Sequence, residues 1–424
     1  MRTDFAATPK TAIVIGAGVV GHCTALALQR SGFATTLIAP AGIVATASLG
    51  NAGHIATEQV EPLASPAAVR GAWKRLFRNG GALALPLRDI ATWLPFVIRL
   101  VRASRPARFA AGRVALSALL ERAMPAWRRV LADAGAHDLL IEAGHIVVWE
   151  SAATAAAGLA RWRAAETGTT RFVELSAAEC AAVAASVAVP IAGGIRFTGS
   201  GQVADLAALQ AALAARFKGL GGVRIDRRVA AIRVVGRRAC VFLEDGSRMP
   251  ADRIVVAAGA ASGELLTPLG LRVPMIAERG YHLHGAADGV GLPPVVFEDR
   301  SVIVTRFRNG MRVAGIVEFG RRDTPPDPAK WRRLQEHAVA LGLPMEGATR
   351  WIGARPTLPD YLPAIGRAGV ADNLLYAFGH QHLGLTLAAV TGELVAALAR
   401  GAEPRVDPAP FDLARFGSDG LGRR

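Results

Sequence analysis

The chain has 424 residues, which allows two or three domains of ordinary size. Hydrophobic residues make up 51% of it, which supports a large buried core and excludes a disordered or fibrous protein. Lys and Arg exceed Asp and Glu by 49 − 34 = 15. These basic residues, nearly all arginines, are spread along the whole chain and do not form runs with interleaved aromatics, so we expect no nucleic-acid partner. A bias of composition, or attraction to an anionic membrane surface, accounts for the charge.

The first forty residues predict a β-α-β unit. Residues 11–16 form a short apolar β run, Val19–Arg30 has helical spacing, and Ala34–Ile38 is again apolar and β-prone. No apolar signal segment precedes this unit, and no stretch reaches the roughly 18 uninterrupted apolar residues of a spanning helix.

A glycine-rich turn joins the first predicted strand to the first helix. Its glycines, Gly16, Gly18 and Gly21, have the spacing G-x-G-x-x-G. At this place the pattern indicates a dinucleotide site, because the glycines permit a tight turn, a close approach of the backbone to a pyrophosphate, and close helix packing. The acidic residue that usually holds the ribose after the second strand is absent, and Ala39 stands there.

The rest of the chain predicts helices first, then a strand-rich region. Residues 66–140 have mostly helical spacing, with further helices at 152–165, 177–183, 205–217 and 385–398. Beyond residue 402, Pro, Gly and Arg predominate and predict a loosely held tail. The predicted strands are His145–Trp149, Val223–Ile225, Val229–Val235, 239–244, 247–249, 253–257, 275–285, Val295–Phe297, 301–307, 311–317 and Leu374–Phe378.

Several separated segments resemble bacterial FAD-dependent D-amino acid dehydrogenases of the D-amino acid oxidase/glycine oxidase superfamily. The resemblance covers residues 11 to about 416, with the segments in the family's order. The segments are Ser48-x-Gly50-Asn51-Ala52-Gly53, Glu61-Pro62-Leu63-Ala64-x-Pro66, Gly280-Tyr281, 303–306 with 313–315, Gly353-x-Arg355-Pro356-x-x-Pro359-Asp360-x-x-Pro363-x-Ile365-Gly366, and Gly379-His380-x-x-Leu383-Gly384-x-Thr386.

The resemblance implies an α/β fold in which a Rossmann-type, glutathione reductase-like FAD-binding domain is interleaved with an antiparallel-β substrate domain. We expect the FAD-binding domain to comprise 11–65, 200–265 and 350–402, the substrate domain 66–199 and 266–349, and the tail 403–424. The residues expected to bind FAD are Gly16, Ala17, Gly18, Val19, Val20, Gly21, Ser48, Gly50, Asn51, Gly53, Val229, Ala258, Gly259, Gly353, Gly379, His380, Leu383, Gly384 and Thr386.

Arg355 matches the family arginine that holds the substrate carboxylate, a task suited to a planar, bidentate guanidinium. Tyr281 is a weaker candidate for the substrate site, and a packed strand aromatic is its alternative. His54 is expected near the flavin ring. His282 and His284 alternate along a predicted strand, but no Cys, Asp or Glu has matching spacing, so we expect no metal.

The predicted activity is oxidative deamination of a D-amino acid: a hydride passes from Cα to flavin N5, and water hydrolyses the imine to an oxo acid. The alternatives are a D-proline, D-hydroxyproline, sarcosine or glycine dehydrogenase or oxidase, a non-catalytic flavoprotein subunit, and an NAD-binding module. Related dehydrogenases pass electrons to a respiratory acceptor, which implies a quinone or an electron-transfer partner.

Residues 92–101 carry apolar side chains on most faces and are flanked by arginines. The segment predicts either a core helix or an amphipathic helix resting on anionic lipid. Cys23, Cys180 and Cys240 lie apart in apolar stretches, as expected of reduced thiols. We therefore expect a cytoplasmic protein, with peripheral contact to the inner face of the cell membrane as a further expectation.

Overall fold

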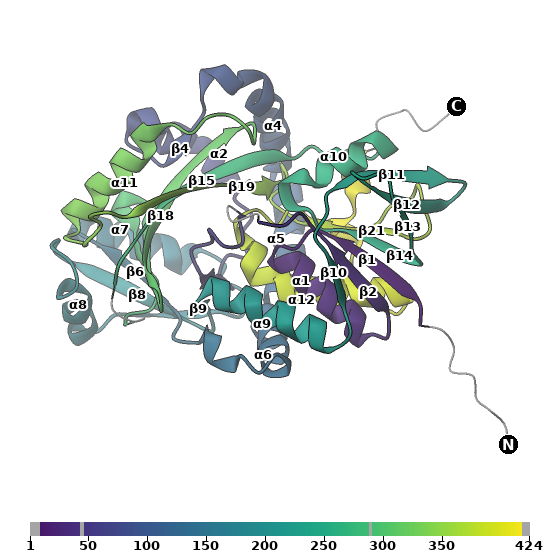
Figure 1. Ribbon diagram of the computed structural model, residues 1–424. Helices are drawn as coiled ribbons and strands as arrows, with labels where there is room; N and C mark the ends of the chain where they lie inside the picture. Colours follow the sequence, from purple (N-terminus) through teal and green to yellow (C-terminus); the bar gives the residue numbers. More distant parts are fainter. Residues whose placement is uncertain (1–8, 43–45, 288–290, 418–424) are drawn as a thin grey trace.

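The computed structural model describes residues 9–42, 46–287 and 291–417, and two large sheets dominate it (Figure 1). The first sheet has six strands in the order β10-β2-β1-β14-β21-β20. Neighbouring strands are parallel except for the pair β20–β21 at one edge. These strands are β1 (Thr11–Ile15), β2 (Ala34–Ile38), β10 (Val223–Ile225), β14 (Arg253–Val256), β20 (Ala364–Arg367) and β21 (Leu374–Phe378).

The central strands of this sheet are apolar throughout because both faces are covered. In β1, Ala12 and Val14 pack against helices, whereas Ile13 and Ile15 pack against a three-stranded antiparallel sheet. The helices are α1 (Val19–Arg30), α6 (Ala123–Asp133), α9 (Leu206–Gly219) and α12 (Gly384–Arg400), and the small sheet comprises β11 (Val229–Val235), β12 (Arg238–Leu243) and β13 (Arg248–Pro250).

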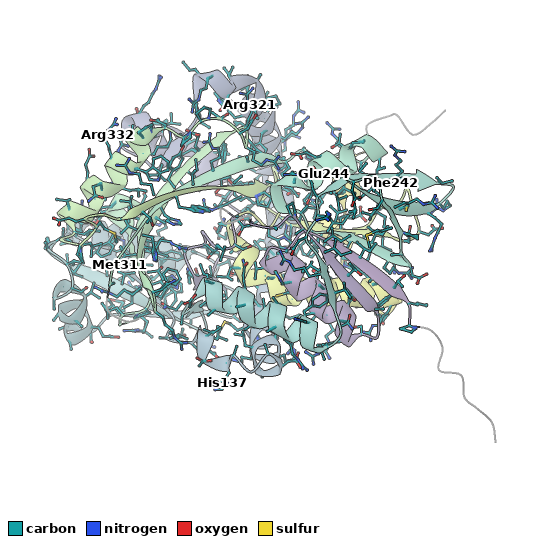
Figure 2. All side chains as sticks on the ribbon, viewed as in Figure 1. His137, Phe242, Glu244, Met311, Arg321 and Arg332 are labelled. Atoms are coloured by element: carbon teal, nitrogen blue, oxygen red, sulfur yellow. The ribbon has the colours of Figure 1, made fainter. Side chains whose placement is uncertain are left out.

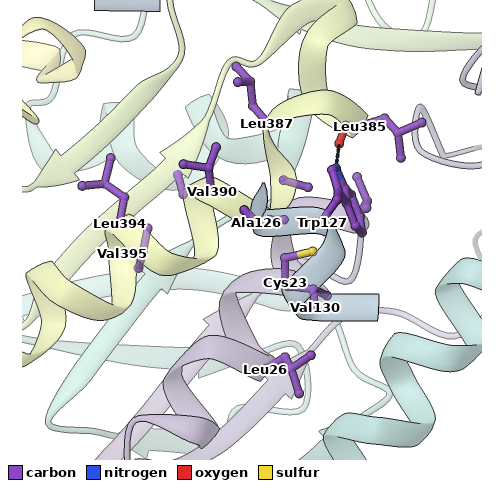
Figure 3. Close-up of a cluster of buried hydrophobic side chains, with 14 of the residues drawn as sticks. Cys23, Leu26, Ala126, Trp127, Val130, Leu385, Leu387, Val390, Leu394 and Val395 are labelled. Carbon is purple, nitrogen blue, oxygen red and sulfur yellow. Dashed lines mark hydrogen bonds between the residues drawn. The ribbon is translucent and has the colours of Figure 1, made fainter. Parts of the chain in front are cut away.

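Helix α12 lies at the centre of the molecule, against α1 and α6 (Figure 3). Trp127 on α6 donates from Nε1 to the Leu385 carbonyl at 3.0 Å. Among the described residues, one segment, Gln381–Arg400, is long and apolar enough to cross a membrane, and 78% of its most apolar window is buried inside the protein. Its hydropathy therefore matches that of a helix at the core of a folded domain.

The second sheet has nine strands and forms the other half of the molecule (Figure 1). Eight strands follow the order β19-β15-β18-β17-β16-β6-β8-β7, and β4 also pairs with β18. The pairs are antiparallel, as expected, except for β16–β6 and β18–β4. The strands are β4 (Leu83–Ala84), β6 (His145–Trp149), β7 (Arg171–Glu174), β8 (Gly193–Thr198), β15 (Ile276–Gly285), β16 (Val295–Phe297), β17 (Val302–Phe307), β18 (Gly310–Gly320) and β19 (Thr349–Thr357).

Shorter elements surround these two sheets. Helix α11 packs on β15 and β18, and α4 packs on the same two strands. The small strands β3 (His54–Ile55), β9 (Gly201–Val203) and β5 (Leu140–Ile141) form a third antiparallel set. The remaining helices are α2 (Pro66–Arg70), α3 (Ala72–Arg75), α4 (Ile90–Ala103), α5 (Pro106–Leu120), α7 (Ala152–Ala164), α8 (Ala177–Ala184), α10 (Ser262–Leu266) and α11 (Pro328–Ala340).

Three predictions about elements need revision. Strand β19 pairs with β15 in the large sheet, although residues 350–402 were assigned to the FAD-binding domain; the other domain boundaries stay predictions. Asp205 is the N-cap of α9 and not its first residue, since its carboxylate accepts from two backbone N–H groups of the first turn. The loosely held tail is wrong for residues 403–417, because Phe411 and Leu413 are buried; residues 418–424 lie outside the described part of the chain.

Candidate functional site

A cavity of about 1110 Å³ extends along the carboxyl ends of the parallel strands to the large sheet. It is lined by the loop between β1 and α1, the end of β14, the start of α12 and strand β19. Ligands of open α/β sheets bind at this edge, where helix N-termini also point. The cavity is therefore the candidate site for both cofactor and substrate.

The Gly-rich turn has the geometry that the spacing predicted. Gly16 has φ +111°, and a Cβ on it would lie 2.4 Å from the Ala257 carbonyl oxygen. A Cβ on Gly21 would lie 1.8 Å from the Gly16 oxygen. Gly18 is the N-cap of α1 and offers no side chain to the free N–H groups there, although Ser48 Oγ accepts from the Val19 N–H at 3.0 Å. Open N–H groups at a helix N-terminus fit a diphosphate.

At the end of the cavity beyond β2, Ala39 stands where an acidic residue was expected. Gln210, Arg224, Val229 and Glu244 line the same end. The Gln210 Nε2 group is buried and has no hydrogen-bond partner in the described part of the chain. A buried amide donor without a partner costs about 1–3 kcal/mol, so this donor fits the polar part of a bound nucleotide.

At the opposite end, Arg355 lines the cavity from β19 and faces Glu278 directly across the strand pair. Its Nη1 donates to Glu278 Oε1 at 3.3 Å. The second carboxylate oxygen of Glu278 accepts from Thr357 Oγ1 at 3.0 Å and from the Tyr361 hydroxyl at 3.2 Å. Glu278 therefore holds the guanidinium in place. No motif in the sequence pointed to Glu278, because only the strand register brings it opposite Arg355.

The loop over residues 46–53, which contains four of the residues expected to bind FAD, is held by the large sheet. Arg312 on β18 donates from Nη1 to the Leu49 carbonyl at 3.1 Å and also to the Asn51 carbonyl. Burial lowers the pKa of Arg312 to about 10, which still leaves it charged at neutral pH. A Cβ on Gly50 would overlap the Trp351 ring. No motif in the sequence pointed to Arg312.

Apart from Tyr281 and His54, the predicted site residues divide into two sets. The predicted residues that line the cavity are Gly16, Ala17, Gly18, Val19, Val20, Ser48, Asn51, Val229, Ala258, Gly259, Gly353, Arg355, His380 and Gly384. The others support the cavity without lining it: Gly21, Gly50, Gly53, Gly379, Leu383 and Thr386. Thr386, for example, accepts through Oγ1 from the Ala56 N–H at 2.9 Å.

The proposed substrate contact of Tyr281 is wrong. Its side chain is 1% exposed and packs on Trp331 of α11, with ring centroids 5.1 Å apart. Its hydroxyl accepts from the Asp327 N–H at 3.2 Å, and burial raises its pKa to about 12. Successive strand residues face opposite sides, and Tyr281 lies on the side opposite to Glu278 and Gly280. Tyr281 thus packs between β15 and α11 and does not line the cavity.

His54 also lies outside the cavity lining and forms a buried cluster with Glu58 and His145. The rings of His54 and His145 have centroids 4.2 Å apart. Burial lowers the pKa of His54 to about 3 and raises that of Glu58 to about 8, so without a bound ion both are neutral at pH 7. His54 therefore does not line the cavity, and its expected place near the flavin ring stays a prediction. His282 does not line the cavity either, and it stacks on Trp351 with centroids 4.6 Å apart.

Comparison with known proteins agrees with this geometry. Residues 11–398 match the family described as FAD dependent oxidoreductase. The chain belongs to this family. It is similar to a D-amino-acid oxidase of Bradyrhizobium diazoefficiens (30% identity, 95% of this chain and 98% of the relative) and to D-amino acid dehydrogenase 2 of Pseudomonas aeruginosa (34% identity, 93% and 96%).

Solved structures share the fold of this family member. Glycine oxidase from Geobacillus kaustophilus superimposes with a TM-score of 0.71 at 22% identity, covering 96% of this chain and 99% of that one. Iminodiacetate oxidase from Chelativorans sp. BNC1 gives 0.69 at 22% identity, covering 95% and 98%. The fold is therefore the predicted FAD-binding Rossmann-type domain with an interleaved β domain, and the cofactor is FAD. The open N-terminus of α1 and the unpartnered Gln210 donor fit that cofactor.

Proposed function

We propose that this flavoenzyme oxidatively deaminates D-amino acids and that Arg355 binds the substrate carboxylate. The observation that carries the proposal is the position of Arg355, which lines the cofactor cavity from β19 and faces the carboxylate of Glu278. The guanidinium is oriented by one buried carboxylate on Nη1 and has 24% of its side chain exposed. Relatives named D-amino-acid oxidase and D-amino acid dehydrogenase, similar over nearly the whole chain, support it.

Bound FAD would accept the Cα hydrogen as a hydride, so the protein itself needs no strong base. The backbone N–H groups at the start of α12 face the cavity at Gly384 and Leu385 and would stabilise negative charge there. His380, at the same turn, is neutral because burial lowers its pKa to about 3. The substrate amine must be neutral when the hydride leaves, so turnover rises with pH.

The test is anaerobic reduction of the purified holoenzyme by a panel of amino acids. We expect D-enantiomers to bleach the flavin absorbance and L-enantiomers to leave it unchanged. D-proline, D-hydroxyproline, sarcosine and glycine belong in the same panel, because the fold neighbours include glycine oxidase. Bleaching by secondary amines alone would replace the proposed substrate class. No bleaching by any amine would make the chain a binding subunit.

We further propose that α4 attaches the protein to the inner face of the cell membrane, where a quinone accepts the electrons. The helix is apolar on two opposite faces. Its inner face packs Phe96 against Ile276 and Phe319. Its outer face exposes a stripe of large apolar side chains at helical spacing: Ile90 (43%), Leu94 (43%), Ile98 (46%) and Val101 (45%). Leu87, in the 3-10 turn just before the helix, is also exposed (66%).

Basic residues surround this stripe. A hydrogen bond at the start of α4 also connects the helix to a residue that lines the cavity. Arg88, Arg102 and Arg105 are exposed around α4. Each such residue contributes about 1 kcal/mol near an anionic surface. Asp89, directly before α4, accepts from Thr324 Oγ1 at 3.1 Å, and Thr324 lines the cavity. A lipid-bound α4 would therefore place the cavity close to a membrane acceptor.

Sedimentation with anionic vesicles tests the attachment. We expect binding at low salt that weakens at high salt, and loss of binding in Leu94→Glu and Ile98→Glu. Val339→Glu is the matched control, since Val339 is 66% exposed on a different helix, α11. Turnover is expected with quinone-like acceptors and little peroxide. Stoichiometric peroxide from a protein that ignores vesicles would identify an oxidase without membrane attachment.

A further inference from the structure

Three buried side chains behind the cavity direct their polar atoms at one another: His54, Glu58 and His145. His54 Nε2 lies 3.7 Å from Glu58 Oε2, and His145 Nε2 lies 3.8 Å from Glu58 Oε1. Their side chains are 8%, 1% and 3% exposed. These separations exceed hydrogen-bonding distance, and His54 Nε2 and Glu58 Oε2 have no hydrogen-bond partner in the described chain. The cluster therefore has polar atoms on several sides of an unfilled centre.

The geometry points to a bound ion: we propose that His54, Glu58 and His145 bind a divalent transition-metal ion of the Zn²⁺ or Fe²⁺ class. One ligand atom from each residue lies within 4.8 Å of the others. Ligands at about 2.0–2.2 Å from such an ion are roughly 3–3.6 Å apart, so each side chain would need to move inward by only a few tenths of an ångström. Two imidazoles and one carboxylate are a common ligand set for these ions.

The surroundings of His145 hold its ring in the orientation that a ligand requires. Its Nδ1 lies 3.2 Å from Ser200 Oγ, which leaves Nε2 for the ion. The ring stacks on Phe197 with centroids 4.5 Å apart and planes 2° from parallel. Rotation of the imidazole away from Glu58 would break both contacts. His145 is thus positioned by groups outside the cluster.

The ion would connect two parts of the molecule that form the cavity. His54 and Glu58 follow the loop over residues 46–53, whereas His145 is the first residue of β6 in the large sheet. Ala56 lies between His54 and Glu58 in the sequence, and its N–H donates a hydrogen bond to Thr386 Oγ1 on α12. We assign the ion a structural role, which is to fix this loop against the large sheet. This assignment replaces the expectation that the protein binds no metal.

Metal content of the full-length holoenzyme is the direct test. The protein should be produced without a polyhistidine tag, in medium supplemented with zinc and iron, and dialysed before elemental analysis. We expect about one ion per chain, lost in Glu58→Gln and in His145→Ala. His137→Ala is the control, because His137 is exposed at the edge of the molecule (Figure 2). A chelator should lower the melting temperature of the wild type and leave that of Glu58→Gln unchanged.

A second measurement keeps the proposal testable if a variant does not fold. Titration of the metal-free wild type with Co²⁺ should give visible absorption bands that saturate at about one equivalent. Wild-type protein without metal after supplementation, and without a cobalt spectrum, would show that the cluster binds no transition-metal ion. Equal metal content in wild type, Glu58→Gln and His145→Ala would place the ion elsewhere. Either result overturns the proposal.

Discussion

Arg355 and Glu278 occupy directly opposite positions on β19 and β15, so the backbone register of two strands sets the distance between their charges. Glu278 is 4% exposed and has three side-chain donors, one of which is Arg355. Arg355 thus donates one hydrogen bond from Nη1 to Glu278, and its other guanidinium N–H groups are available to a ligand in the cavity. Lysine has no such fork, because its ammonium is a single point charge.

At the residue scale we predict that Arg355→Lys raises KM for D-amino acids roughly 30-fold, which corresponds to ~2 kcal/mol of lost binding. The folded protein should keep its FAD, because Glu278 retains a cationic partner. Steady-state kinetics on wild type and variant provide the measurement. Arg350→Lys is the control, since Arg350 is exposed on the same strand. An unchanged KM in Arg355→Lys would assign the carboxylate to another residue.

The side chain of Arg312 joins strand β18 to the loop over residues 46–53. A charged donor contributes about 1.5–3 kcal/mol per hydrogen bond, and both acceptors are backbone carbonyls of the loop. The same loop supplies Ser48 and Asn51 to the cavity. The large sheet therefore supports the cofactor site of the other domain.

At the element scale we predict that Arg312→Met weakens FAD retention at least 10-fold, because the loop loses its anchor while methionine still fills the space. The measurement is the dissociation constant for FAD, obtained from flavin fluorescence on dilution. Arg308→Met is the control, since Arg308 forms a half-exposed ion pair with Asp138. Equal FAD affinity in both variants would mean that the loop is held by its own backbone contacts.

Across the whole molecule, several histidines are buried without a positive charge. Burial lowers the pKa of His282 to about 2 and that of His380 to about 3. Both values lie below the pKa of an unfolded histidine, near 6.5. The unfolded chain therefore binds more protons between pH 6.5 and pH 3. The contribution of these neutral histidines to the free energy of unfolding is fully present above pH 6.5 and is lost as the pH falls through this window.

We predict that moving from pH 7.5 to pH 5.5 lowers the free energy of unfolding by about 1.4 kcal/mol for each of these two histidines. His380→Gln should remove one of the two contributions while it keeps a polar contact to Thr391. Urea-induced unfolding at both pH values measures the difference. His137→Gln, at an exposed position, should behave as the wild type does. The same pH dependence in His380→Gln would contradict the prediction.

Local features could be predicted from the sequence. The β1-α1-β2 unit and its glycine turn depend on neighbouring residues, so spacing alone located Gly16, Gly18 and Gly21 correctly. The resemblance likewise placed Arg355 on the cavity. The sequence could not predict which residues of β15 face which side of the sheet. Tyr281 and Glu278 are both buried, and polar and apolar residues do not alternate along the whole of this strand.

Contacts between distant segments were decided only by the tertiary structure. The cluster of His54, Glu58 and His145 joins a loop to a strand far along the chain, and Arg312 reaches a loop of the other domain. The sequence also could not show which face of α4 is exposed to solvent, because both of its faces are apolar. The sequence by itself determined most of the elements and the dinucleotide motif, because these follow from short-range spacing, whereas the substrate role of Arg355 came from the family resemblance and stays a proposal. Register and packing between the sheets determined which buried polar groups meet, because that depends on long-range contacts that no local pattern encodes.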